Sequence, residues 1–141
     1  MGKSILFICN MNSVRSPMAA ALLRSEAGGA LRVDSAGVYE GGLDPFVEKV
    51  MAEIGVSLVG HEPKPVGSLD LSKIDLAIVL TPEAAAEARK YLPREQIEFW
   101  PIENPSDVRG GTEDILNAYR AVRDDLRQRL RERFPQFHQK P

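Results

Sequence analysis

The sequence contains a single cysteine, Cys9, and only two histidines, His61 and His138, among its 141 residues. One cysteine excludes an internal disulfide framework and a cysteine-based structural zinc site. We therefore expect no metal and no cofactor. The 18 Lys and Arg residues are balanced by 20 Asp and Glu, so a broad basic surface for nucleic acid is also excluded.

Long apolar runs are missing as well, and the N-terminal residues do not have the pattern of a signal peptide. We therefore expect no membrane span and no membrane partner. A lone thiol that carries chemistry has to stay reduced, which predicts a cytoplasmic protein.

Short apolar runs alternate with amphipathic stretches along the whole chain. Strands are predicted at about residues 4–9, 31–36, 74–80 and 96–100, and helices at about 17–27, 45–54, 82–91 and 112–134. Such alternation predicts one α/β domain over 1–141, with a four-stranded parallel sheet flanked by helices on both faces. The residues after Phe134, about 135–141, are expected to form a frayed tail.

Cys9 ends the first predicted strand and is followed by a polar loop that closes with Arg15-Ser16-Pro17. Ser16 is predicted to cap the next helix, with Pro17 at its first position. Loop amides and a helix N-terminus form a nest for an anion of phosphate size, and they favour the thiolate of Cys9. Arg15 can donate two parallel hydrogen bonds to a phosphoryl group, and Ser16 can donate its hydroxyl to the thiolate. The remaining phosphate-binding candidates are Asn10, Met11, Asn12, Ser13 and Val14.

The motif Cys-x5-Arg-Ser, between the first strand and the first helix, resembles the low-molecular-weight protein tyrosine phosphatase family. That family shares its flavodoxin-like fold with the thioredoxin-coupled arsenate reductases, and its pattern is roughly Cys-x-Gly-Asn-x-x-Arg-Ser-Pro. The sequence retains the residues of this pattern at Cys9, Asn12, Arg15, Ser16 and Pro17. It departs at Met11, where the family has glycine, and at Val14, where many members carry a second cysteine. The resemblance implies that Cys9 is the nucleophile, Arg15 the phosphate clamp, Asn12 a brace for the loop and Ser16 a stabiliser of the thiolate.

The resemblance also places a general-acid aspartate in an Asp-Pro pair before the last helix, where this chain has Asn104-Pro105. Asparagine cannot give up a proton at neutral pH. Asp107 and Glu103 are the alternatives for this role, and a solvated loop carboxylate is the ordinary interpretation of Asp107. Tyr39 is the candidate for an aromatic wall of the substrate cleft, or else it packs in its own loop. His61 is expected to be structural or simply exposed.

Three functions follow from these residues. The first is a phosphatase that acts on phosphotyrosine, in a phosphorylated protein, or on small aryl phosphates through a cysteinyl-phosphate, slowly if the acid is absent. The second is an arsenate reductase that uses an external thiol, because the relay-type reductases need two further cysteines. The third is a non-catalytic module that binds phosphate or phosphoproteins. Inorganic phosphate, arsenate and vanadate are expected ligands in each case.

Overall fold

The computed structural model describes residues 3–39, 41–58 and 61–137. Strands β1 (Ser4–Cys9), β2 (Arg32–Gly37), β3 (Leu76–Val79) and β4 (Ile97–Phe99) form one sheet with the order β2-β1-β3-β4. All of its strand pairs are parallel. The helices are α1 (Arg15–Ala27), α2 (Pro45–Ala52), α3 (Pro82–Ala88) and α4 (Thr112–Arg133). The predicted α/β fold is confirmed.

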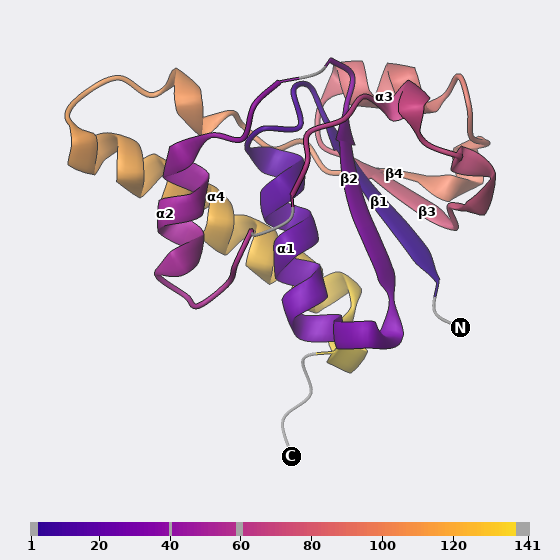
Figure 1. The fold of residues 1–141 in the computed structure, drawn as a ribbon, viewed down its shortest axis with the longest axis horizontal. Helices are drawn as coiled ribbons and strands as arrows, with labels where there is room; N and C mark the ends of the chain where they lie inside the picture. The colour runs from indigo at the N-terminus through magenta and orange to yellow at the C-terminus, as the bar shows by residue number, and fades with distance from the viewer. Residues whose placement is uncertain (1–2, 40, 59–60, 138–141) are drawn as a thin grey trace.

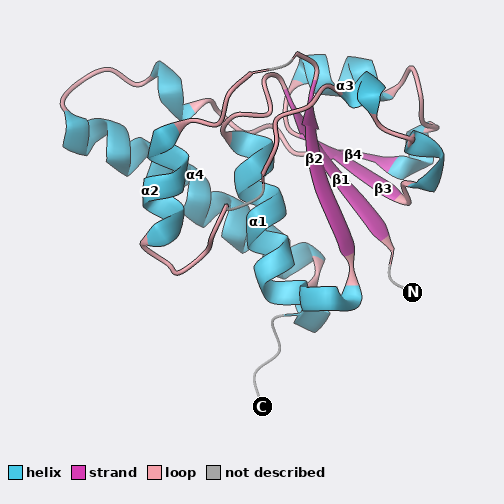
Figure 2. Ribbon diagram, in the orientation of Figure 1, coloured by secondary structure: helices cyan, strands magenta, loops and turns pink. Residues whose placement is uncertain are grey.

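The helices cover both faces of the sheet (Figures 1 and 2). Ile5, Phe7 and Cys9 of β1 pack in a core with α1, α2 and α4, whereas Leu6 and Ile8 pack in a second core with α3. Successive side chains of a strand point to opposite faces, so a strand covered on both sides reads as a continuous apolar run. This explains why β1 is buried along its whole length.

The first turns of two helices are capped by side chains. Asp44 Oδ1 accepts a hydrogen bond from the Phe46 amide at the start of α2 (2.8 Å). Thr81 Oγ1 accepts one from the Ala84 amide at the start of α3 (2.9 Å). At α4 the capping position is Gly111, and Thr112 is the first helical residue, as predicted by the range 112–134. These caps fix the helices that border the carboxyl ends of the strands.

The predicted start of α1 is wrong by two residues. The helix begins at Arg15 after Val14, and Ser16 lies inside its first turn instead of capping it. The Ser16 hydroxyl bonds to Cys9 and Asn12 instead, so it is not available as a cap. Pro17 still fits, because the amides of the first turn have no partner within the helix.

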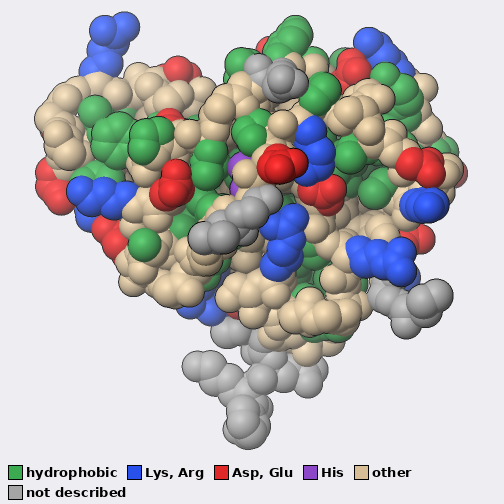
Figure 3. All heavy atoms as spheres, in the orientation of Figure 1, with side chains coloured by type: hydrophobic (Ala, Val, Ile, Leu, Met, Phe, Trp, Pro, Cys, Tyr) green, Lys and Arg blue, Asp and Glu red, His purple; other side chains and the backbone are tan. Residues whose placement is uncertain are grey.

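The chain after α4 forms a short 3₁₀ turn over Pro135–Phe137, and Phe137 packs against the core. The rest of the predicted tail, 138–141, lies outside the described residues. Within the part of the chain that is described, no helix is long and apolar enough to cross a membrane. Basic and acidic side chains are interspersed over the face in Figure 3, which carries no extended patch of one charge.

Candidate active site

The thiol of Cys9 lies at the carboxyl end of β1, where the strand order reverses and ligands of such sheets usually bind. The side chain is 2% exposed, and its Sγ lies 2.9 Å from Ser16 Oγ in the first turn of α1. The Ser16 hydroxyl also lies 3.3 Å from the Ala36 carbonyl oxygen. The sulfur is therefore held between a hydroxyl and the N-terminal end of a helix, where the dipole favours an anion.

Asn12 holds the loop in its curved shape. It is fully buried and has a φ of +54°, in the left-handed region that asparagine tolerates better than most residues. Its Nδ2 donates to Ser16 Oγ (2.9 Å), and its Oδ1 accepts from the Lys64 amide (3.0 Å). One side chain thus connects the loop to α1 and to a segment 52 residues further along the chain.

His61 supports the same residue from outside the loop. Its Nε2 lies 3.2 Å from the Asn12 carbonyl oxygen, which can only accept, so Nε2 carries the hydrogen. Burial is the main cause that lowers the pKa of His61 below its usual 6.5, which keeps the ring neutral at neutral pH. The structure thus gives His61 a structural contact, one of the two roles expected from the sequence.

Gly37 allows the chain after β2 to pass directly over the loop. A Cβ there would lie 2.6 Å from the Tyr39 carbonyl oxygen and 2.8 Å from the Asn12 amide nitrogen. The close approach is fixed by hydrogen bonds from the Val38 amide to the Cys9 carbonyl (3.0 Å) and from the Tyr39 amide to the Asn10 carbonyl (2.7 Å). Backbone approaches of this kind require glycine.

Arg15 joins the loop to the far side of the sheet. Its Nη1 donates to the Ile102 carbonyl after β4 (2.9 Å). Beside it, Thr81 Oγ1 donates to Asn10 Oδ1 (2.6 Å) and so ties the end of β3 to the loop. A cavity of about 380 Å³ lies here, and its lining includes Asn10, Arg15, Thr81 and Glu103. The guanidinium therefore faces a hollow that opens at the carboxyl ends of β3 and β4.

The two departures from the family pattern fit the geometry of the loop. Asn12 is the only non-glycine residue with positive φ among the described residues, so Met11 occupies its position without left-handed strain. Its side chain is 43% exposed and lies against the backbone of Gly41. Val14 is buried in the core and fills the place where a second thiol would stand.

Asn104 caps a short 3₁₀ turn over Pro105–Asp107. Its Oδ1 accepts from the Ser106 amide (3.1 Å) and from Ser106 Oγ (2.8 Å). Both alternative acids, Glu103 and Asp107, are exposed. Only Glu103 lines the cavity at Arg15, so it is the better placed of the two.

Tyr39 is 58% exposed and lies outside the lining of that cavity. A second hollow, of about 490 Å³, lies on the other side of the loop, and Ser13, Leu43, Ser106 and Val108 contribute to it. Tyr39, the candidate for an aromatic wall of the substrate cleft, therefore lines neither hollow.

Ser13 is anchored from α2 and α4, a link that the sequence does not reveal. The Asp44 amide donates to the Ser13 carbonyl (3.1 Å), and the Tyr119 hydroxyl donates to Asp44 Oδ2 (2.5 Å). Burial and the Asp44 carboxylate both raise the pKa of Tyr119, so its hydroxyl remains a donor. In the sequence Tyr119 is only one member of the apolar stripe of α4.

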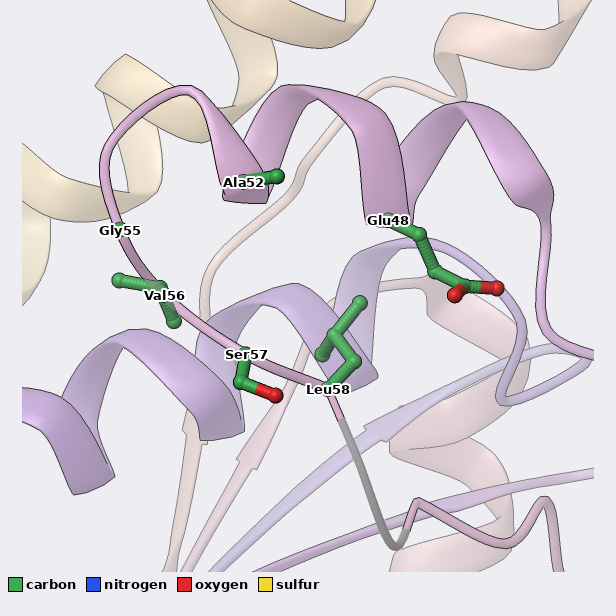
Figure 4. Close-up of a pocket in the computed structure, with 6 residues that line it drawn as sticks. All are labelled: Glu48, Ala52, Gly55, Val56, Ser57 and Leu58. Atoms are coloured by element: carbon green, nitrogen blue, oxygen red, sulfur yellow. The ribbon is translucent and has the colours of Figure 1, made fainter.

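A further hollow of about 400 Å³ lies at the end of α2 (Figure 4). Leu58 points from the following segment toward the helix, and Glu48 is the one ionisable residue in the lining. It shares no lining residue with the two hollows beside the loop. Among the described residues no group of three or more His, Cys, Asp and Glu could hold a metal ion.

The site combines a buried thiol at a strand end, a loop braced by a buried asparagine and an arginine at the start of a helix, on a parallel α/β domain. This arrangement suits an oxyanion. Residues 4–140 match the sequence profile of the low molecular weight phosphotyrosine protein phosphatases. The chain belongs to this family.

Its relatives carry more than one activity in their names. The arsenate reductase of Bacillus subtilis (strain 168) is 32% identical over 130 residues, which cover 92% of this chain and 94% of that protein. The YwlE arginine phosphatase, solved as a mutant with a phosphorylated active-site serine, is 25% identical, with a TM-score of 0.74 and 97% of each chain covered. The low molecular weight protein tyrosine phosphatase of T. tengcongensis shares the fold, with a TM-score of 0.81 at 20% identity over 96% of this chain and 99% of that one.

Proposed function

We propose that this chain is a phosphatase that hydrolyses phosphotyrosine or small aryl phosphates through a cysteinyl-phosphate on Cys9. The observation that carries the proposal is the Cys9 Sγ to Ser16 Oγ contact of 2.9 Å at the N-terminal end of α1. The single hydroxyl hydrogen of Ser16 lies within reach of the Ala36 carbonyl (3.3 Å), and in this proposal it turns to Cys9 Sγ when the thiol ionises. Together with the helix dipole it then stabilises the thiolate, which is the nucleophilic form of cysteine. In this proposal Arg15 binds two phosphoryl oxygens, and the amides from Asn10 to Val14 bind the third.

The reaction has two steps. The thiolate attacks phosphorus, the S–P bond forms, and the bond to the ester oxygen breaks so that the alcohol leaves with the bonding pair. Water then attacks phosphorus, the S–P bond breaks, and phosphate is released with Cys9 restored as the thiolate. The alcohol needs a proton as it leaves, and Asn104 cannot supply one. We therefore expect esters with poorly basic leaving groups to react fastest and phosphotyrosine to react slowly, with Glu103 as the alternative donor that lines the cavity at Arg15.

Arsenate reduction is the second candidate, and the names of the relatives favour it over phosphatase activity. Arsenate has no ester group to expel, but the oxygen that Cys9 displaces leaves as water and also takes up a proton, which Asn104 cannot supply. Cys9 would displace water from arsenate, and an external thiol would attack Cys9 Sγ to release arsenite and form a mixed disulfide. A second external thiol would then restore Cys9. The single cysteine favours the phosphatase, because the chain has no other thiol for a relay.

Two assays separate the candidates. The first measures hydrolysis of 4-nitrophenyl phosphate, and the second measures arsenate-dependent oxidation of glutathione or dithiothreitol. We expect the first activity to be lost in Cys9→Ser and strongly reduced in Arg15→Lys, which keeps the charge but not the two-pronged geometry. Thiol oxidation without ester hydrolysis would favour the reductase. Vanadate or phosphate binding without either activity would favour the non-catalytic module.

A further inference from the structure

A groove lies between α3 and the edge strand β4. It has a volume of about 760 Å³, about twice that of the cavity at Arg15. Its apolar lining includes Leu92, Ile97 and Phe99. Phe99 is 48% exposed and gives the groove an accessible apolar surface.

The groove is continuous with the candidate active site. Pro82 and Phe99 line both the groove and the cavity that contains Arg15. The groove therefore adjoins this cavity, and a chain bound in the site can extend into the groove along β4.

Two arginines give the groove a positive charge. Arg89 follows α3 and Arg94 precedes β4, and both are exposed. Neither guanidinium has an ion pair or a hydrogen bond to any described residue, whereas neighbouring Lys90 is paired with Glu87 (3.0 Å). At the other end of the path Glu83 and Glu103 line the cavity at Arg15. An occupant therefore gains most from acidic groups at the arginine end.

The edge of the sheet suits an extended chain. Beyond β4 no strand pairs with the described sheet, so one row of its backbone donors and acceptors has no strand partner. Ile97 and Phe99 lie on the face of α3, while Glu98 points to the other face and pairs with Arg133 (2.7 Å). Main-chain pairing at an edge combined with side-chain pockets is a general mode of peptide recognition.

The register of the path follows from the contact between Arg15 and the Ile102 carbonyl. Arg15 contacts the chain at residue 102, and Ile97, which lines the groove at the start of β4, lies five residues earlier. An extended chain rises by about 3.3 Å per residue, so this path corresponds to about five residues of a bound peptide.

We propose that this groove binds an extended, acidic segment of a phosphoprotein substrate, with its acidic side chains at Arg89 and Arg94, about five residues from the phosphorylated residue. The proposal rests on the phosphatase activity proposed above and names the class of substrate. It makes Phe99, Arg89 and Arg94 determinants of specificity that do not touch the reacting atoms.

The test compares phosphotyrosine peptides that carry two glutamates or two lysines at the fifth and sixth positions from the phosphotyrosine, on either side of it. The native chain should prefer the acidic peptide by about five- to tenfold in kcat/KM on one side, as expected of two exposed ion pairs. Arg89→Glu/Arg94→Glu should abolish or reverse this preference while 4-nitrophenyl phosphate is hydrolysed as before. Arg32→Glu is the matched control, because Arg32 is exposed on β2 at the opposite edge of the sheet.

Several results would overturn the proposal. The proposal fails if the native chain does not prefer the acidic peptide on either side of the phosphotyrosine. It also fails if Arg32→Glu changes this preference as much as the double variant does. If sedimentation shows a dimer that the double variant dissociates, the groove holds a second copy of this chain instead. If the native chain hydrolyses no aryl phosphate, the proposed function fails, and the groove is then judged by binding of the fluorescently labelled acidic peptide. In that case the groove proposal is overturned if Arg89→Glu/Arg94→Glu binds this peptide as tightly as the native chain does.

Discussion

An Asn104→Asp substitution places an ionisable carboxyl group at the start of the turn after β4. General-acid catalysis typically contributes about 10²- to 10⁴-fold to a rate, which corresponds to about 3 to 5 kcal/mol of barrier. For phenyl phosphate, whose leaving group is basic, we expect kcat/KM, which reports the steps up to loss of the leaving group, to rise by about 100-fold or more. For 4-nitrophenyl phosphate, whose leaving group departs without a proton, we expect a change of less than about threefold.

The surroundings of Asn104 set the pH range of this gain. Ser106 donates to Asn104 Oδ1 from both its amide (3.1 Å) and its hydroxyl (2.8 Å). The same donors would stabilise a carboxylate and lower its pKa, and an acid catalyst acts only while it is protonated. The gain with phenyl phosphate should therefore fall as pH rises. Adding Ser106→Ala removes one donor, raises the pKa of the new carboxyl group and moves this fall to higher pH.

The assay is a series of substituted phenyl phosphates, with log(kcat/KM) plotted against the pKa of the leaving phenol. The native chain should give a steep negative slope, and Asn104→Asp should flatten it. Glu103→Gln and Asp107→Asn serve as controls in the native background. The reasoning is refuted if Asn104→Asp raises both kinds of substrate equally. It is also refuted if Glu103→Gln alone lowers the phenyl phosphate rate by about 100-fold, since Glu103 would then already be the acid.

Three further predictions concern the supports of the site. Asn12→Gly should lower the free energy of unfolding, measured in urea, by about 2–4 kcal/mol, because two buried hydrogen bonds are lost. Asn12→Ala should lower it by about 1 kcal/mol more, because alanine is strained at the positive φ of this position. An equal decrease in the two variants would contradict the strain argument. Tyr119→Phe should cost about 1–2 kcal/mol by removing the bond to Asp44, which a thermal melt of the two proteins would measure. Hydrogen bonding to Arg120 is the main cause that lowers the pKa of Glu53 from 4.5 to about 2. The ion pair of Glu53 therefore stabilises the fold above pH 4.5, and this stabilisation is lost as pH falls toward 2. Glu53→Gln should flatten the dependence of stability on pH in this range, and an unchanged dependence would show that the ion pair is not formed in solution.

Local features of the candidate site could be predicted from the sequence. The apolar run before Cys9 and the polar loop after it fix the strand and the turn, because both depend on neighbouring residues only. The start of α1 could not be placed, since Ser16 has the composition of a cap while its hydroxyl bonds to Cys9, seven residues away, in the folded chain. A propensity rule cannot weigh a tertiary partner against a local one.

The contacts that support the loop could not be predicted from the sequence for the same reason. Asn12 bonds to the Lys64 amide across 52 residues, and Arg15 bonds to the Ile102 carbonyl across 87. Backbone groups take part in both contacts, and a backbone group leaves no mark in the sequence. Gly37 is the exception in principle, because a glycine after a strand signals either a turn or a close backbone approach, and the structure has the latter.

In the mechanism proposed above, oxyanion binding and ester cleavage depend on different parts of this chain. The contacts that hold Cys9, Asn12 and Ser16 in place come from β1, α1, the end of β2 and the segment around Lys64, and none of these contacts involves residues 103–107. We therefore expect that a change at position 104 can add or remove a proton donor while the loop keeps its shape and its proposed affinity for a tetrahedral anion. Relatives named for arsenate reduction and for phosphatase activity can share one loop on this basis. The residues that distinguish the activities should be sought in the turn at Asn104 and in the thiols available to Cys9, rather than in the loop itself.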